Sequence, residues 1–412
     1  MPDLIQEWIE TSRQKHQNKG NPTMFNEERQ LQSPIRWGMV GGGRGSEIGH
    51  AHRAAARRDG FFQLVAGTFD IDPERGREFG SNLGVAPERC YSDYAAMFAA
   101  EAEREDGLQA VSIATPNGTH YAISKAALEA GLHVVCEKPL AFTVQECEEL
   151  KQLAEAKQRV FGVMYGYSGY PMLHQAREMV KRGDLGEIRV VNMQFAHGFH
   201  NTAVEENSPG AKWRMNPEIS GPTYVLGDIG THCWQMAEMI TGLQADKLCC
   251  MRQSFIPSRA PLEDNAHVMV KFKSGAVGTL WASSVNAGSM HQQKIRIIGE
   301  KASLEWWDEH PNQLKYEIQG QPAQLLDRGM GYLYSDDPGV CTRIGGGHAE
   351  GFFESWANLY HRFGLAMDAA EQDDQGTLNG LWYPGADDGI SGVRLLECCV
   401  ESADNDSKWV NF

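Results

Sequence analysis

Two short segments of this sequence carry side chains that can move a proton and stabilise a negative charge. In residues 227–232 (GDIGTH), Asp228 and His232 are four apart, a spacing that places both on one face of a helix. In residues 137–139 (EKP), Lys138 directly follows a predicted strand. Histidine exchanges protons near neutral pH, an acidic neighbour orients it, and a lysine stabilises a developing alkoxide. Around a nicotinamide, these three side chains would suit the oxidation of an alcohol by hydride transfer.

Each of these three residues also has a structural interpretation. A lone lysine such as Lys138 is usually a solvated charge, and His232 on an amphipathic helix could be a satisfied structural histidine. Asp228 could be a helix cap. The spacing alone therefore leaves the catalytic and the structural interpretations open.

A glycine-rich turn near the start of the chain predicts a dinucleotide site. The segment VGGGRGSEIG follows an apolar run, and such a turn lets backbone N–H groups approach a pyrophosphate at a helix N-terminus. Gly41 and Gly43 fit the G-x-G-x-x-G spacing, but Gly49 comes about three residues late, and a merely tight turn is the alternative. The residues predicted to contact the cofactor here are Gly41, Gly43, Arg44, Gly45, Ser46 and Ile48.

An acidic residue supports the cofactor interpretation. Asp70 ends the second predicted strand, LVAGTFD, where a carboxylate can accept hydrogen bonds from the ribose hydroxyls. A carboxylate there disfavours the 2′-phosphate of NADP, so NAD is the expected cofactor and NADP the less favoured one. Asp70 could instead cap the next helix, although Asp72, directly before Pro73, is the better cap candidate.

The elements that must position these residues fall into two groups. Short apolar runs at 35–40, 64–69, 110–115 and 132–136 alternate with helical stretches, which predicts βαβ units and a parallel sheet. After about residue 165 the strands are longer and alternate in polarity, with hairpins predicted over 266–284 and 291–307. The predicted organisation is an N-terminal extension (1–33), a dinucleotide-binding domain (34–165) and a substrate-binding and oligomerisation domain (166–412).

Four motifs in this order resemble the Gfo/Idh/MocA oxidoreductases, the relatives of glucose–fructose oxidoreductase and inositol dehydrogenase. They are the glycine-rich turn, TPNGTH (115–120), EKP (137–139) and GDIGTH (227–232), and the resemblance covers about residues 34–400. It implies an α/β fold, with a Rossmann parallel sheet followed by an α/β domain that has an open, mostly antiparallel sheet. It also implies a sugar or cyclitol substrate and a homo-oligomer, commonly a dimer or tetramer.

The resemblance also assigns roles to single residues. Lys138 matches the family's EKP lysine, Asp228 its substrate-binding aspartate and His232 its catalytic histidine. The loop beside the nicotinamide is matched by Thr115, Pro116, Asn117 and His120, and Glu137 precedes the lysine at the cofactor. The lengthened glycine-rich turn departs from the family pattern, which leaves the pyrophosphate contacts within it open.

Further segments are predicted to face the substrate, since polar groups and aromatic rings suit a sugar ring. The candidate residues are Tyr167, Tyr170, Trp213, Arg214 and His348, the last near Glu350 in a glycine-rich segment before a helix. A loop or interface role is the alternative for each. His197 and His200 have no evident third ligand, so no metal site is expected.

The net charge of the chain argues against two classes of binding partner. The 412 residues carry a net charge of −16, which disfavours binding to nucleic acid or to an anionic membrane surface. No apolar run of about 18 residues predicts a membrane span, and residues 1–20 lack the apolar core of a signal peptide.

Nine scattered cysteines fit free thiols in a reducing cytosol, so a cytoplasmic location is expected. The second face of the predicted antiparallel sheet, which carries Met269, is expected to mediate self-association.

The leading hypothesis is an NAD-dependent dehydrogenase for a secondary hydroxyl of a sugar, glycoside or cyclitol. Two alternatives stay open: an NAD-dependent glycosidase that works by oxidation and elimination, and a non-catalytic sugar or nucleotide sensor. The presence of Lys138, Asp228 and His232 together argues against the sensor.

Overall fold

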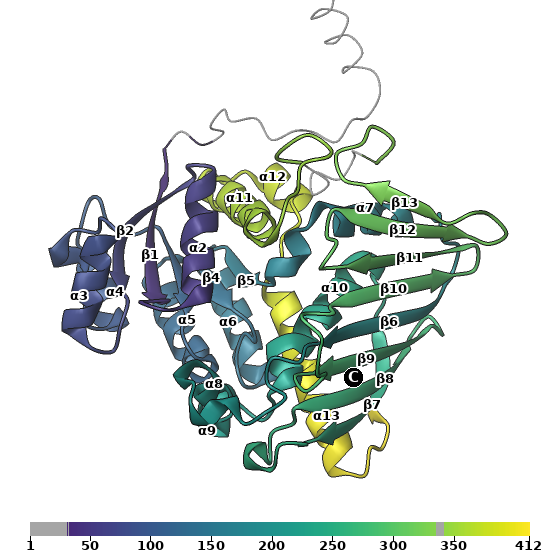
Figure 1. Cartoon of the computed structure of the whole chain (residues 1–412). Coiled ribbons are helices and arrows are strands. Elements are labelled where there is room, and N and C mark those ends of the chain that lie inside the picture. Colours follow the sequence, from purple (N-terminus) through teal and green to yellow (C-terminus); the bar gives the residue numbers. More distant parts are fainter. Residues whose placement is uncertain (1–30, 32, 335–341) are drawn as a thin grey trace, which may run out of the picture.

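The computed structural model describes residue 31, residues 33–334 and residues 342–412 (Figure 1). The predicted N-terminal extension, residues 1–33, therefore lies almost entirely outside the described residues. Two sheets dominate the described part, one in each half of the chain.

The first sheet has five strands in the order β2-β1-β3-β4-β5, all parallel, which is the Rossmann arrangement predicted from the sequence. Its strands are β1 (Ile35–Gly41), β2 (Phe62–Thr68), β3 (Ala110–Ala114), β4 (His133–Glu137) and β5 (Phe161–Met164). The helices between them are α2 (Glu47–Arg58), α3 (Pro73–Asn82), α4 (Tyr94–Ala102), α5 (His120–Glu129) and α6 (Val144–Ala156), with short turns η1 (Pro87–Arg89) and η2 (Asn117–Thr119). Because helices cover both faces, the strands are apolar and largely buried.

Local sequence signals explain where these helices begin. The Ser46 side chain accepts a hydrogen bond from the Gly49 amide and caps α2. The Asp72 side chain accepts from the amides of Glu74 and Arg75 and caps α3, so Asp72, not Asp70, is the cap. A Cβ on Gly49 would lie 2.2 Å from the Gly42 carbonyl oxygen, so the late glycine permits a close approach of α2 to the turn.

The second sheet has nine strands in the order β13-β12-β11-β10-β6-β9-β8-β7-β14. All neighbours are antiparallel except β6 and β9, and both predicted hairpins, β8–β9 and β10–β11, are present. The strands are β6 (Ile188–Ala196), β7 (Ala245–Gln253), β8 (Asn265–Phe272), β9 (Val277–Ser283), β10 (Lys294–Gly299), β11 (Ala302–Trp307), β12 (Gln313–Ile318), β13 (Gln324–Asp327) and β14 (Val410–Asn411).

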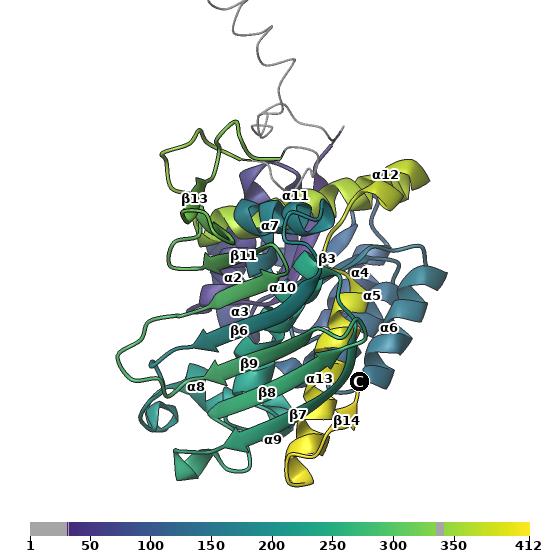
Figure 2. The same ribbon diagram turned by 90° about the vertical axis from the view of Figure 1, so that its right-hand side faces the viewer.

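Within the described part of the chain, helices cover one face of this sheet and leave the other without a helix. Figure 2 shows α7 (Pro171–Lys181), α10 (Thr231–Thr241) and α13 (Ala386–Asp404) behind the sheet, whereas no helix covers the face toward the viewer. Along β8, Val268 and Val270 are buried against the helices while Met269 is exposed. The alternation predicted from the sequence therefore gives an open sheet with one bare face.

The C-terminal helices join the two halves. Trp356, Tyr360 and Phe363 of α11 (Phe352–Glu371) share a hydrophobic core with Trp37 of the first sheet. The remaining short elements are η3 (Gly166–Gly169), η4 (Val204–Glu206), α8 (Pro209–Arg214), α9 (Pro217–Ser220), η5 (Leu226–Gly230), η6 (Pro257–Arg259) and α12 (Gln375–Gly380). Among the described residues, no helix has the length and apolar character needed to cross a membrane.

Candidate active site

A polar cavity of about 340 Å³ lies between the two halves of the chain, beyond the carboxyl ends of β3 and β4. Ligands bind at this edge of open parallel sheets. Lys138, Asp228 and His232 all line this cavity. The predicted residues Ile48, Asn117, Glu137, Tyr167, Trp213 and Arg214 line it as well.

Lys138 is held at the end of β4 by a buried polar relay. Oε1 of Glu137 lies 3.1 Å from Nε2 of His52, and Nδ1 of His52 lies 2.6 Å from the Tyr360 hydroxyl. The other Glu137 oxygen accepts a hydrogen bond from the Lys138 amide. Helices α2 and α11 therefore fix the backbone from which the lysine side chain extends.

The Lys138 ammonium reaches across to the second half of the chain. Its Nζ donates to the Asp228 carbonyl oxygen at 2.5 Å and lies 3.3 Å from Asp228 Oδ1. Arg214 Nε is 3.5 Å from the same carboxylate oxygen. Burial alone would raise the pKa of Asp228, but the positive charges of Lys138 and Arg214 outweigh burial and hold this pKa well below its usual value. Asp228 is therefore ionised at neutral pH.

His232 is a buried, neutral imidazole. Burial, reinforced by the charge of Lys138, lowers its pKa well below the ordinary value, against the opposing effect of Asp228. Its Nδ1 is buried and has no hydrogen-bond partner among the residues that the structure describes. The ring packs edge-to-face on Tyr167, with ring centroids 4.9 Å apart. An imidazole that is neutral at neutral pH can accept a proton.

The local geometry around Asp228 differs from the sequence expectation. Asp228 lies in η5, a single π-helical turn, and His232 lies in the first turn of α10, so the two do not share one regular α-helix. Thr231 ties the turn together by donating its hydroxyl to the Gly227 carbonyl oxygen. π-Turns inside helices are frequent at functional sites, and this one leaves the Asp228 carbonyl within reach of Lys138.

The glycine-rich turn packs closely against the carboxyl ends of β2 and β3, which requires glycine at its tightest positions. Gly41 has φ +78°, and a Cβ on Gly43 would lie 2.0 Å from the Phe69 carbonyl oxygen, so any side chain at Gly43 would force the backbone to move. Gly45 and Ser46, at the N-terminus of α2, line a cavity that adjoins the polar one. Exposed amides at a helix N-terminus fit a pyrophosphate.

Asp70 follows the carboxyl end of β2, as expected for a ribose ligand. Its Oδ1 accepts from the Asp72 amide at 2.9 Å and from the Arg75 guanidinium at 2.8 Å. The hydrogen bond from Arg75 lowers the pKa of Asp70, so a carboxylate stands where a 2′-phosphate would come. The residues present therefore fit NAD.

Three predicted cofactor residues make polar contacts within the chain. His120 is fully buried, and its two ring nitrogens bond the carbonyls of Pro139 and Thr115, so it joins two loops and cannot reach the cavity. Arg44 pairs with Glu78 on the exposed surface of α3. The Thr115 hydroxyl accepts a hydrogen bond from Thr119 within its own loop.

Of the five predicted substrate residues, four line one or both cavities and one does not. Tyr167 lines the polar cavity, Arg214 lies over the ring of Trp213 at 4.6 Å in that cavity, and Tyr170 lines only the adjoining cavity. His348 does not line either cavity, because its loop is anchored elsewhere.

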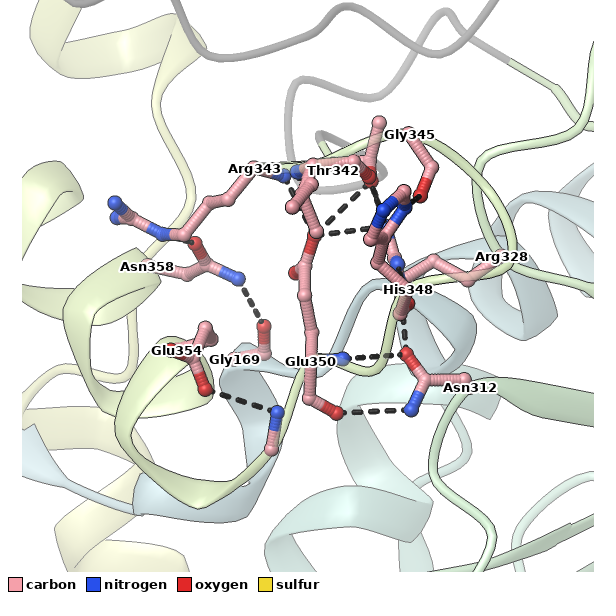
Figure 3. Close-up of polar contacts among 12 residues, drawn as sticks. Gly169, Asn312, Arg328, Thr342, Arg343, Gly345, His348, Glu350, Glu354 and Asn358 are labelled. Carbon is pink, nitrogen blue, oxygen red and sulfur yellow. Dashed lines mark hydrogen bonds and ion pairs between the residues drawn. The ribbon is translucent and has the colours of Figure 1, made fainter.

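Figure 3 shows the cluster that anchors the loop of His348. Glu350 is buried and paired with Arg328 at 2.7 Å, and Arg328 also donates to the His348 carbonyl oxygen. The His348 ring itself is exposed and lies against the Gly345 carbonyl. His348 and Glu350 therefore belong to the anchored segment that leads into α11, and His348 lies outside both cavities.

Several cavity residues were not singled out from the sequence. His291 lines the cavity with Nδ1 2.6 Å from Asp308 Oδ2, and Phe195 and Phe199 line it beside His291. The sequence analysis considered His197 and His200 only as metal ligands, but both line the cavity. Burial lowers the pKa of His197 to about 4. The described residues contain no group of three or more His, Cys, Asp or Glu side chains arranged to hold a metal ion.

Comparison with known proteins decides the family. The model of the oxidoreductase family's NAD-binding Rossmann fold (GFO_IDH_MocA) matches residues 35–165, and the model of its C-terminal alpha/beta domain matches residues 177–412. The chain belongs to the Gfo/Idh/MocA oxidoreductase family. The resemblance seen in the motifs is thereby confirmed.

Relatives in the Gfo/Idh/MocA family match nearly the whole chain. The uncharacterized oxidoreductase YfiI of Bacillus subtilis (strain 168) is 55% identical over 94% of this chain and 100% of that protein. Levoglucosan dehydrogenase of Pseudarthrobacter phenanthrenivorans is 26% identical over 91% of this chain and 97% of its own length.

A solved structure also matches nearly the whole chain. The crystal structure of an inositol dehydrogenase homolog from Azotobacter vinelandii, complexed with NADH and myo-inositol, is 58% identical, with a TM-score of 0.90, and covers 94% of this chain and 100% of that one. The chain is thus an NAD-binding Gfo/Idh/MocA oxidoreductase, and the predicted cofactor, NAD, is confirmed.

Proposed function

We propose that this protein oxidises a secondary hydroxyl of a sugar, glycoside or cyclitol, with Lys138, Asp228 and His232 as its catalytic residues. The observation that carries the proposal is the meeting of these three side chains in one polar cavity at the carboxyl edge of the cofactor sheet. Relatives whose names include inositol dehydrogenase homolog and levoglucosan dehydrogenase support the substrate class.

In this proposal, one domain binds the cofactor and the other binds the substrate. Residues 34–165 hold NAD through the glycine-rich turn and Asp70, and residues 166–412 hold the substrate. Bound NAD supplies the hydride acceptor. His232 accepts the proton of the reacting hydroxyl, since its imidazole is neutral at neutral pH. Lys138 donates a hydrogen bond to the same oxygen and stabilises the negative charge that develops there.

Asp228 is the positioning group in this scheme. Its carboxylate and carbonyl oxygens hold the Lys138 ammonium, and its ionised carboxylate can accept a hydrogen bond from a substrate hydroxyl. Arg214, beside the Asp228 carboxylate, and Trp213 offer a stacked cation and aromatic surface, which suits one face of a sugar or cyclitol ring.

Self-association through the open sheet is part of the proposal. Met269 and Val277 are 52% and 45% exposed on the bare face, and leaving such side chains in water is unfavourable. A homodimer or homotetramer would cover them. The eight cysteines among the described residues are buried and unpaired, which supports the proposed cytoplasmic location.

A substrate panel tests the proposed function. Purified protein is mixed with NAD⁺ and with hexoses, methyl glycosides and inositols, and NADH formation is followed by absorbance. We expect NADH with at least one polyol. Product released with no net NADH would favour oxidation and elimination instead. Binding of NAD without turnover of any panel member would favour the sensor.

A further inference from the structure

A buried glutamate lies behind the turn that carries Asp228, and it lines neither of the two cavities. Glu263 is 1% exposed and comes shortly before β8 in the chain. Its Oε1 accepts hydrogen bonds from the amides of Tyr224 and Leu226, at 3.0 Å each. The amide between them, that of Val225, donates to the Glu263 carbonyl oxygen at 3.4 Å. Three successive amides at the entry to η5 are therefore bonded to one residue from a distant part of the chain.

The segment that Glu263 holds continues directly to the catalytic side chains. The Asp228 amide donates to the Tyr224 carbonyl oxygen at 2.8 Å. The Asp228 carbonyl oxygen in turn accepts a hydrogen bond from the Lys138 ammonium. The Tyr224 hydroxyl is also hydrogen-bonded to His200, which lines the polar cavity. A series of hydrogen-bonded residues thus connects Glu263 to Lys138 and to one wall of the cavity.

η5 depends on this outside support because it lacks a capping side chain next to it in the sequence. The first amides of a helical turn have no partner within the turn. A polar side chain just before the helix usually supplies that partner, but Val225, the residue before η5, is apolar and makes no such bond. Glu263 bonds these amides instead, so the place of η5 is set by the position of Glu263.

The carboxyl group of Glu263 acts as a buried acceptor more than as a full charge. Burial raises its pKa to about 7, against the hydrogen bond from the Leu226 amide and the charge of Arg252. Arg252 Nη1 lies 3.6 Å from Glu263 Oε2 and is engaged by the Pro222 carbonyl oxygen as well. Near neutral pH the carboxyl group is therefore about half protonated. A neutral side chain with an oxygen at the same place should hold the turn nearly as well.

We propose that Glu263 is a positioning residue of the oxidation reaction, which fixes η5 and thereby holds Asp228 and the Lys138 ammonium in their reactive places. Glu263 itself touches neither substrate nor cofactor. This inference rests on the proposed function for the roles of Asp228 and Lys138. A displacement of about 1 Å at a catalytic group can lower turnover by about 100-fold, so the loss of this buried oxygen should be visible in kcat.

Three replacements of Glu263 test whether its acceptor oxygen is what matters. Glu263→Gln keeps an acceptor for both amides, and kcat on a substrate that the panel identifies should stay within about threefold of the wild type. Glu263→Leu has a similar size and no acceptor, and kcat should fall about 10- to 100-fold. Glu263→Asp keeps the charge but ends one methylene short of the amides, and kcat should fall about 10-fold. NADH affinity should stay unchanged in all three, because residues 34–165 hold the dinucleotide.

Glu350→Leu is the matched control, because Glu350 is buried and bonded in the same way as Glu263 but holds a different segment. Glu350 is 2% exposed, and its Oε1 accepts hydrogen bonds from the amides of Arg343 and Ile344. It is also paired with Arg328, as Figure 3 shows, and it lines neither cavity. Glu350→Leu should therefore lower the unfolding temperature and leave kcat unchanged.

Two further measurements separate a positioning role from a general loss of stability. Hydrogen exchange needs no substrate: peptides that cover residues 222–230 should exchange faster in Glu263→Leu and at the wild-type rate in Glu350→Leu. The second is a double variant. Glu263→Leu combined with Asp228→Ala should lower kcat far less than the product of the two separate effects, because both changes act on the same ammonium.

Four results would overturn the positioning role. They are an unchanged kcat in Glu263→Leu, equal losses of kcat in Glu263→Leu and Glu350→Leu, unchanged exchange of residues 222–230, and effects that multiply in the double variant. If Glu263→Leu does not fold, Glu263→Asp takes its place in each comparison. Unchanged kcat in the Glu263 variants of an active enzyme would leave the proposed function standing. Turnover of no compound by the wild type would refute that function, and the exchange rates would then decide whether Glu263 holds the turn.

Discussion

Replacing Asp70 with alanine should change which dinucleotide the protein prefers. Asp70 follows the carboxyl end of β2 and accepts a hydrogen bond from Arg75 at 2.8 Å, which lowers its pKa, so it carries a negative charge at neutral pH. With NAD bound, its carboxylate would accept hydrogen bonds from the ribose. With NADP it would face the negative 2′-phosphate.

The size of the effect has two sources. Loss of hydrogen bonds to a charged acceptor should weaken NAD binding by about 1.5–3 kcal/mol. Removal of a like charge about 4 Å from a phosphate should help NADP by between about 1 kcal/mol, the value in water, and about 4 kcal/mol, the value near a protein surface. Arg75, released from Asp70, becomes free to pair with the phosphate. Together these effects amount to about 2.5–7 kcal/mol, so the preference for NAD over NADP should fall about 10²- to 10⁵-fold.

Fluorescence titrations of NADH and NADPH measure this preference. Asp72→Ala is the matched control, because Asp72 is a neighbouring carboxylate whose side chain caps α3; it should cost some stability and leave the preference unchanged. Adding Arg75→Ala to Asp70→Ala should remove the gain for NADPH. The reasoning is refuted if the wild type binds NADPH more tightly, or if Asp70→Ala leaves the ratio of affinities unchanged.

Three further predictions concern stability and assembly. His120→Leu removes the imidazole partner of the buried Pro139 carbonyl and of the half-buried Thr115 carbonyl, and it should lower the free energy of unfolding by about 2–4 kcal/mol in denaturant titration; a loss below about 1 kcal/mol would contradict a structural role of His120. The pKa of His197 is about 4 in the folded chain and about 6.5 in the unfolded chain. Between these two pH values only the unfolded chain binds the proton. The free energy of unfolding should therefore decrease as the pH falls from about 6.5 to 4, by up to about 3 kcal/mol. His197→Gln should flatten that slope, and an unchanged slope would argue against the low pKa. Met269→Asp should dissociate an oligomer seen by light scattering, whereas a monomeric wild type would refute assembly through the open sheet.

The fold was largely accessible from the sequence because its signals are local. Short apolar runs separated by helical stretches predicted the parallel strands, and alternating polarity along residues 266–284 predicted the hairpin and the bare face. The cap at Asp72 was also readable, since proline follows it directly. The packing of α11 on Trp37 could not be predicted from the sequence. An amphipathic helix shows that one of its faces is buried, but it does not show whether that face packs on the first or the second sheet.

The candidate site was only partly accessible. Lys138, Asp228 and His232 belong to motifs with characteristic spacing, and the fold brings them together. His291 and Asp308 form a pair across a hairpin, seventeen residues apart, and no local pattern marks such a pair. His120 and His348 had suggestive neighbours, but their contacts depend on loops that meet only in the folded chain. A weak signal for His197 and His200 did exist, since they follow a strand that ends beside the cavity.

The central claim is that His232 accepts the substrate proton in an otherwise intact dinucleotide-binding protein. The direct measurement compares wild type and His232→Ala on a substrate that the panel identifies, with NADH formation and NADH affinity measured on the same samples. General-base catalysis contributes about 10²- to 10⁴-fold, so turnover should fall by that factor while NADH affinity changes little. Near-wild-type turnover in His232→Ala would contradict the account, and the base would then have to be sought at His291, the other imidazole held by a carboxylate in the cavity.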